Sequence, residues 1–324
     1  MATGTVAQTS VTTHQRRGIV NGDIIFKGAT TLFALAVLGV AILMVATLVY
    51  NSQTSLSRYG FSFFTGDVWD PNIKVVFGAR PYIFGTIASS LLALLIAGIV
   101  GVGVALLLVE LHLPRWFSTP VALLVELLAA IPSVVYGVWG IFVLIPIMQS
   151  HVDPFLHNVL GWLPLFGEDS GGGRSLLTAA LVLAMMIVPT VAAISREVIR
   201  VVPENQREAM LALGATRWEM IRMAVLPYAR PGIIGALILA LGRAVGETLA
   251  ATMVIGNSPY FGPNLFRSAD TLASKIANNL SEATGLQLAA LFELGLILLL
   301  VSVVLNVLAR LLVWSVSRGS AQLT

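Results

Sequence analysis

Six long apolar stretches alternate with polar segments along this chain. They cover residues 29–50, 83–109, 120–148, 176–194, 231–255 and 288–314. Each has close to the roughly 20 residues, or more, that an α-helix needs to cross the hydrocarbon core of a bilayer. The pattern predicts an all-α polytopic membrane protein, with one transmembrane domain over residues 29–314 and the lipid bilayer as its main solvent.

The segments between the apolar stretches predict how the chain is oriented. The first stretch exceeds the 7–15 apolar residues typical of a signal peptide, so we expect an uncleaved span. With six spans, twelve of the 19 Lys and Arg residues fall on the side that holds both termini, and six fall on the other side. Because positive residues concentrate in cytoplasmic loops, residues 1–28 and 315–324 are predicted to be cytoplasmic tails, and residues 195–230 a cytoplasmic loop.

Composition narrows the function classes. Hydrophobic residues make up 57% of the chain and charged residues only 11%, which excludes an ordinary soluble enzyme. No cysteine is present, so thiolate chemistry and cysteine-based metal sites are excluded. The histidines His14, His112, His151 and His157 are dispersed, and we expect no metal site. The net charge of +3 reflects membrane orientation, and no nucleic-acid partner is expected.

The loop 195–230 reads as two short helices. Pro203 suits a first helical turn, and Gly214 suits a left-handed C-terminal cap. Thr216 and Glu219 have the spacing of a capping box. We expect the second helix to run to residue 225 and to be stopped by Leu226-Pro227. On composition alone, an amphipathic hairpin on the membrane surface is the alternative.

Charged residues inside the predicted spans are candidates for function, because a charge at mid-bilayer costs about 2.5–3.5 kcal/mol on insertion scales. Arg243 and Glu247 are four residues apart in the fifth span, which places them on one helical face. They form either a static ion pair or an anion site on a translocation path, with Glu247 as the counter-ion of Arg243. Glu126 precedes Pro132, where we expect the third span to break or kink, and it could also line a path, whereas Glu293 is expected near the membrane surface.

The order of residues in the loop 195–230 resembles the EAA loop of ATP-binding-cassette importer permeases, E-A-A-x3-G-x9-I-x-L-P. Matching positions are Glu208, Ala209, Gly214, Leu226 and Pro227, while Met210 and Ala224 depart from the motif. The resemblance implies a type I importer permease whose loop docks on a cytoplasmic ATPase. The chain has no G-x-x-x-x-G-K-[ST] phosphate loop, so we expect a non-catalytic subunit without a cofactor of its own, with ATP and Mg bound by separate ATPase subunits.

A narrower resemblance extends over most of residues 61–248. The stretches that carry it are similar to the PstC permease family of phosphate-specific importers: residues 69–71, 77–79, 85–86, 130–140 and 243–248. It implies location in a bacterial plasma membrane, and a heterodimer with a second permease (PstA-like). It also implies two ATP-binding subunits (PstB-like) and an extracytoplasmic phosphate-binding protein (PstS-like). In that family the arginine and glutamate of the fifth span are needed for phosphate passage, which corresponds to Arg243 and Glu247.

The expected function is therefore the permease subunit of an ATP-driven phosphate importer. Three alternatives stay open at this stage. A permease for another oxyanion, sulfate or molybdate, fits the same arginine. A secondary or proton-coupled transporter could use Arg243, Glu126 and Glu247 as relay groups. The third alternative is a membrane scaffold or sensor that transports nothing.

Overall fold

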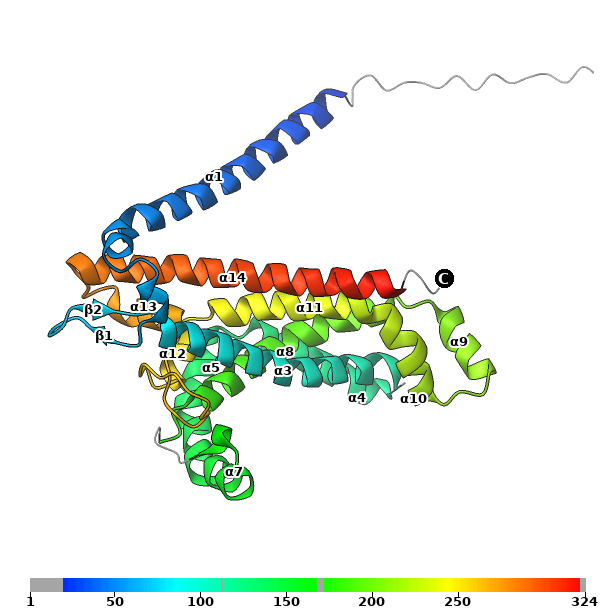
Figure 1. Ribbon diagram of the computed structural model, residues 1–324. Helices are drawn as coiled ribbons and strands as arrows, with labels where there is room; N and C mark the ends of the chain where they lie inside the picture. Colours follow the sequence, from blue (N-terminus) through cyan, green and yellow to red (C-terminus); the bar gives the residue numbers. More distant parts are fainter. Residues whose placement is uncertain (1–19, 112, 168–171, 321–324) are drawn as a thin grey trace, which may run out of the picture. The chain divides into compact units, whose positions relative to one another are not determined.

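Helices dominate the computed structural model, which describes residues 20–111, 113–167 and 172–320 (Figure 1). The chain divides into two compact units, residues 1–47 and 48–324. Helix α1 (Val20–Tyr59) begins in the first unit and ends in the second. Residues 20–28, which we assigned to a cytoplasmic tail, are helical, and the rest of that tail, residues 1–19, lies outside the described residues.

Six helical stretches of the described chain are long and apolar enough to cross a membrane, as the hydrophobic pattern predicted. They are Asp23–Tyr59, Arg80–Glu110, Ser133–Leu160, Leu176–Arg200, Arg217–Gly246 and Gly285–Leu311. Most of these helical stretches extend beyond the apolar stretch that predicted them, because the helix continues into the polar residues that flank it. The third and fifth stretches differ from the predicted ranges 120–148 and 231–255 for a separate reason, described with the site below.

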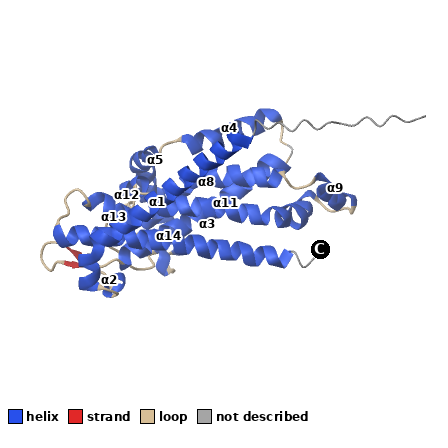
Figure 2. Cartoon of the chain, turned by 90° about the horizontal axis from the view of Figure 1, so that it is seen from above, coloured by secondary structure: helices blue, strands red, loops and turns tan. Residues whose placement is uncertain are grey.

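Four helices of the second unit lie side by side in both views (Figures 1 and 2): α3 (Arg80–Glu110), α8 (Leu176–Arg200), α11 (Leu226–Gly246) and α14 (Gly285–Ser320). Small residues set how closely they approach. A methyl group added at Gly101 of α3 would lie 2.8 Å from Val191 of α8, and one at Gly232 of α11 would lie 2.4 Å from Val198 of α8. α8, which contacts both α3 and α11, is the most buried of these helices. α14 continues past residue 314, where we placed the last span's end.

Three wide, five-residue turns interrupt the helices, and each is followed two residues later by a proline. They are η1 (Gly140–Leu144), η2 (Met148–Val152) and η4 (Ile221–Val225), which precede α6 (Ile145–Ile147), α7 (Asp153–Leu160) and α11. A proline has no N–H to donate, and its ring clashes with the carbonyl one turn earlier. The wide turn displaces that carbonyl, so the helix continues through the proline. Leu226-Pro227 therefore does not stop the second loop helix, which contradicts our prediction.

The loops at the end of the bundle away from the loop 195–230 carry short elements (Figure 1). A hairpin of β1 (Trp69–Asp70) and β2 (Val76–Phe77) pairs Trp69 with Phe77 and Asp70 with Val76. The Asp70 carboxylate accepts backbone N–H bonds from residues 72–74, each 3.0 Å long, and these bonds lower the pKa of Asp70 below its usual value. The remaining elements there are α2 (Ser62–Thr65), η3 (Pro164–Phe166) and α13 (Leu272–Asn279).

Candidate functional site

The third membrane stretch is broken at Pro132. Helix α4 (Arg115–Ala130) ends there, Ile131 and Pro132 have extended backbone angles, and α5 (Ser133–Trp139) begins anew. A residue before proline avoids helical angles for steric reasons, which explains the position of the break. The Tyr136 hydroxyl donates to the carbonyl oxygen of Leu128 at 2.8 Å, which also accepts the Ile131 N–H at 3.3 Å, so α5 adds a second hydrogen bond to the last turn of α4. The break or kink that the sequence predicted at Pro132 is thus a full break, and residues 120–130 form part of a separate helix.

The fifth membrane stretch is broken as well, at Glu247. Helix α11 ends at Gly246, Glu247 has an extended backbone, and α12 (Leu249–Val254) follows. The Glu247 carboxylate accepts the backbone N–H of Ala250 at 3.1 Å, so it caps the start of α12. Our prediction of one continuous helix with Arg243 and Glu247 on a single face is therefore wrong. Among the described residues no ion pair joins the two side chains.

The two breaks lie close together because the helices that follow them pack against each other. A methyl group at Gly137 of α5 would lie 2.5 Å from the sulfur of Met253 and 3.2 Å from Cα of Ala250, both in α12. Gly140 approaches Val254 in the same way, at 2.7 Å. The glycines thus allow α5 and α12 to touch. Discontinuous helices that meet in this manner are the usual location of substrate sites in membrane transporters.

Arg243 lies in the last turn of α11, immediately before the break. Its Nη1 donates to the Thr190 hydroxyl of α8 at 3.4 Å. The side chain is exposed in this chain, and so are the neighbouring Gly242 and Gly246. The site therefore presents a guanidinium that no described carboxylate neutralises, on a surface that is open beside two helix breaks.

Glu126, the third predicted path residue, lies elsewhere. It is on α4, where its carboxylate is 66% exposed and approaches Nη1 of Arg196 on α8 at 3.7 Å. The pair borders a hollow of about 440 Å³ between α4 and α8. Glu293, which we expected near the membrane surface, is 1% exposed and lies within α14.

The loop 195–230 contains the predicted local structure. Helix α9 (Glu204–Ala212) is followed by Gly214 at φ +82°, the left-handed conformation that we expected there. The capping box between Thr216 and Glu219 starts α10 (Arg217–Met220). Both glycine and capping box confirm the sequence signals. α10 then runs through η4 into α11, so the loop is joined to the fifth membrane stretch without interruption.

The motif residues of α9 face outward. Glu208 and Ala209 are exposed, and two large apolar side chains stand nearby, Leu213 at 83% and Trp218 at 64% exposure. Leu226 is half-buried and Pro227 exposed at the start of α11. The exposed apolar residues form a surface suited to contact with another protein.

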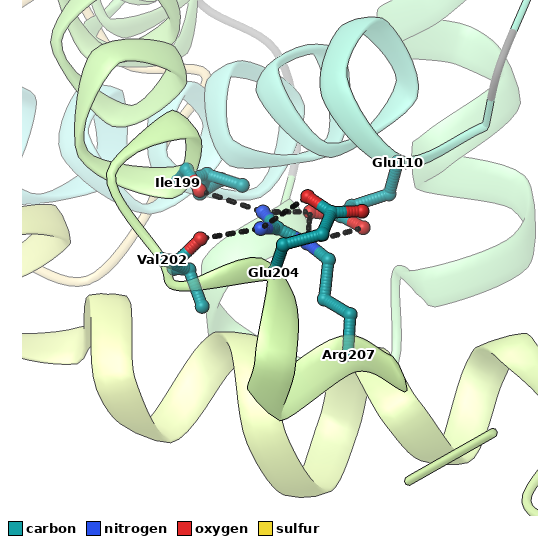
Figure 3. A network of polar contacts seen from close by, with 5 residues as sticks. All are labelled: Glu110, Ile199, Val202, Glu204 and Arg207. Atoms are coloured by element: carbon teal, nitrogen blue, oxygen red, sulfur yellow. Dashed lines mark hydrogen bonds and ion pairs between the residues drawn. The ribbon is translucent and has the colours of Figure 1, made fainter. Parts of the chain in front are cut away.

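Arg207, on the same helix, was not a candidate in our reading of the sequence. Its guanidinium binds the Glu110 carboxylate through Nη2 at 2.8 Å and Nε at 3.2 Å, and it donates to the carbonyls of Ile199, at 2.9 Å, and Val202 (Figure 3). Glu204 approaches it at 3.7 Å from the solvent side. The side chains of Glu110 and Arg207 are only 2% and 11% exposed. We call this group, Arg207 with Glu110 and the two carbonyls, the clasp.

A signal for Glu110 was present in the sequence, since it ends the second apolar stretch without a charged neighbour before it. No sequence pattern, however, indicated that its partner is 97 residues away. Arg207 looked like one of several charges in a mixed-charge loop. Pairing across that separation follows from the tertiary packing of α3 against α8.

Comparisons with known proteins agree on one family. Residues 97–318 match the family model described as "Binding-protein-dependent transport system inner membrane component". Two relatives are each named a phosphate transport system permease protein: PstC of Pasteurella multocida, 42% identical over 91% of this chain and 93% of its own, and PstC 2 of Mycobacterium tuberculosis, 40% identical over 89% and 91%.

Solved structures share the fold. A bacterial ABC transporter involved in the import of the acidic polysaccharide alginate has a TM-score of 0.61, with 17% identity over 91% of this chain and 98% of the other. The MetNI methionine ABC transporter has a TM-score of 0.52, with 19% identity over 72% and 93%. At these identities the structures support the arrangement of helices alone.

Proposed function

The chain belongs to the family of binding-protein-dependent transport system inner membrane components, and from that premise we propose that it is the permease subunit of an ATP-driven importer of inorganic phosphate. It forms half of the translocation path in a bacterial plasma membrane, with both termini in the cytoplasm. A second, related permease forms the other half. The relatives named phosphate permeases support the choice of substrate class.

The observation that carries the proposal is the position of Arg243 beside the two helix breaks. A guanidinium stays charged at every working pH and offers its N–H donors as a fork that fits two oxygens of a tetrahedral anion. Among the described residues, Arg243 makes one long hydrogen bond, to Thr190, and its remaining donors are open toward the exposed surface. A phosphate ion that passes between the two permeases meets these donors.

Glu247 has a different role from that of a counter-ion for Arg243, which the sequence had led us to expect. Its carboxylate takes the N–H of Ala250, so the start of α12 is already occupied by a negative group. An anion at the break therefore binds the guanidinium and does not bind the start of α12, which Glu247 already occupies. That arrangement favours passage, because a transport site must release its ion as readily as it binds it. Glu126, in the hollow between α4 and α8, lines the cytoplasmic side of the same path.

The energy source lies in partner subunits. Two ATPase subunits bind ATP and Mg, and one of them docks on the segment that carries Glu208, Ala209 and Gly214, where the exposed Leu213 and Trp218 supply apolar contact area. An extracytoplasmic phosphate-binding protein delivers the ion to the loops that hold β1, β2 and α13. The relatives' names as transport permeases agree with a subunit that moves a solute without converting it chemically.

Uptake of labelled phosphate by the reconstituted complex tests the proposal. A hydrogen bond to a charged group contributes about 1.5–3 kcal/mol, so we expect Arg243→Ala to reduce uptake about 10–150-fold at equal protein level. Arg230→Ala, which removes an exposed arginine earlier on α11, is the matched control and should transport normally. Normal phosphate uptake by Arg243→Ala would refute the anion site. Uptake of sulfate or molybdate in place of phosphate by the unmodified complex would refute the substrate.

A further inference from the structure

The clasp joins three segments of the chain. Arg207 belongs to α9, Glu110 is the last residue of α3, and the two carbonyls belong to Ile199, in the last turn of α8, and to Val202, just after it (Figure 3). Glu110 is 97 residues away from Arg207 along the chain, whereas the carbonyls of Ile199 and Val202 are only 8 and 5 residues away. One side chain therefore ties the coupling helix to two membrane helices at once.

The chemistry of the clasp suits a rigid connection between α9 and α3, which we call the joint. The three nitrogens of the guanidinium lie in one plane, and all three are engaged, so the position of Arg207 is defined in several directions. A lysine could not reach the carboxylate and both carbonyls with this geometry, since it carries a single ammonium nitrogen. Because the charged groups are 2% and 11% exposed, water and salt screen their attraction far less than that of a surface ion pair.

Helix α3 extends from the clasp to the opposite end of the bundle. Its 31 residues form one unbroken helix about 46 Å long. At its far end a methyl group added to Gly85 would lie 2.0 Å from the carbonyl oxygen of Asp270, and the Thr86 hydroxyl accepts the N–H of Leu272 at 2.9 Å. Ala269, just before this segment, pairs with Gly256, two residues beyond the end of α12. Movement of α3 as a body thus reaches the segment that follows the broken fifth helix.

We propose that Arg207 is a positioning residue that makes α9 and α3 move as one body, so that ATPase movement at the coupling segment is delivered to the outer loop that contacts Gly85 and Thr86. The proposal rests on the proposed function for its ATPase partner. It assigns a role to a residue outside the motif surface, since the exposed Glu208 and Ala209 meet the ATPase while the buried Arg207 holds the membrane helices.

A distance measurement tests the joint in the complete, unmodified complex. The chain has no cysteine, so cysteines introduced at Asn205 on α9 and at Leu91 on α3, both exposed, are its only two thiols for spin labels. We expect the same label distance without nucleotide and with ATP trapped, because both labels belong to one moving body. A change larger than the width of the distance distribution would overturn the proposal.

A paired substitution tests whether the joint matters for transport. Glu110→Met with Arg207→Met removes both charges together, which avoids leaving one buried charge without a partner. The matched control is Glu197→Met with Arg200→Met, which removes the nearby exposed ion pair of 3.1 Å. We expect the clasp variant to assemble and to hydrolyse ATP, while phosphate moved per ATP falls about tenfold or more, a coupling loss of the usual allosteric size. The control should stay at the wild-type ratio.

The outcomes separate the joint from the proposed function. An assembled clasp variant with a normal ratio of phosphate to ATP would overturn the positioning role and leave only a structural one. Arg207→Lys keeps the charge but loses bonds to the carbonyls, and we expect a ratio between those of the wild type and the paired variant. If the wild-type complex hydrolyses ATP but takes up no phosphate, the substrate assignment fails, and the label distance still decides on the joint.

Discussion

Gly232 determines how closely α11 can lie against α8, and its replacement by alanine makes a quantitative prediction. A methyl group there would lie 2.4 Å and 2.6 Å from the two methyl carbons of Val198, where ordinary contacts are 3.4–4 Å. Because both methyl groups of Val198 are too close, a rotation of its side chain cannot clear the clash. α11 has to move by about 1 Å, and with it Arg243 relative to Thr190.

The expected magnitude combines two opposing effects. Overpacking of this kind costs typically about 1–3 kcal/mol, while alanine in a helix interior gains about 1 kcal/mol over glycine. Gly232→Ala should therefore lower the free energy of unfolding by up to about 2 kcal/mol. In a chain that already carries Val198→Ala the two methyl clashes are gone and only the Cβ of residue 198 stays close, at 3.1 Å, so the same change should be neutral or stabilising by up to about 1 kcal/mol. The two substitutions are thus coupled by about 1–3 kcal/mol.

Heat denaturation of the purified complex in detergent measures this coupling across the four proteins of the cycle. A change of 1 kcal/mol corresponds to roughly 2–4 °C in Tm for 150–250 residues, so for this chain of 324 residues we expect about 2 °C or less per kcal/mol. We expect the Tm of Gly232→Ala to be lowered and the Tm of the double variant to equal or exceed that of Val198→Ala alone. If Gly232→Ala lowers Tm equally in both backgrounds, the helices do not meet at these residues and the packing of α11 on α8 is different from the one described.

Two further predictions concern the coupling loop and the outer segment. Gly214→Ala should lower the free energy of unfolding by about 1–2 kcal/mol, because the left-handed φ of +82° is unfavourable for a residue with a side chain. It should also reduce co-purification of the ATPase. Gly235→Ala, a control in helical and open surroundings, should have neither effect. Burial raises the pKa of Asp270 to about 6 from its ordinary 3.8, against the opposing effects of Ser274 and Lys275. The folded protein then binds the proton more tightly than the unfolded chain, so stability should fall by up to about 3 kcal/mol as pH rises from about 4 to about 6 and level off above. Thermal denaturation at several pH values checks this, and an unchanged pH profile in Asp270→Asn would contradict it.

The sequence by itself determined the class of protein and the local structure of the coupling loop. Six apolar stretches require six membrane helices because the backbone must satisfy its own hydrogen bonds in lipid. Gly214 and the Thr216 capping box were readable because their chemistry acts over a few residues. Both are short-range effects, and both were confirmed.

Only the tertiary structure decided how the charged residues are used. Arg243 and Glu247 have helical spacing in the sequence, but the helix is interrupted between α11 and α12. The Glu247 carboxylate caps the second helix and does not pair with the arginine. Pro227 reads as a helix stop, yet the wide turn before it lets the helix continue. The Glu110 and Arg207 side chains meet across 97 residues because α3 packs against α8. The partner of a buried charge is set by which helices pack together, and the spacing of residues along the chain does not show that packing.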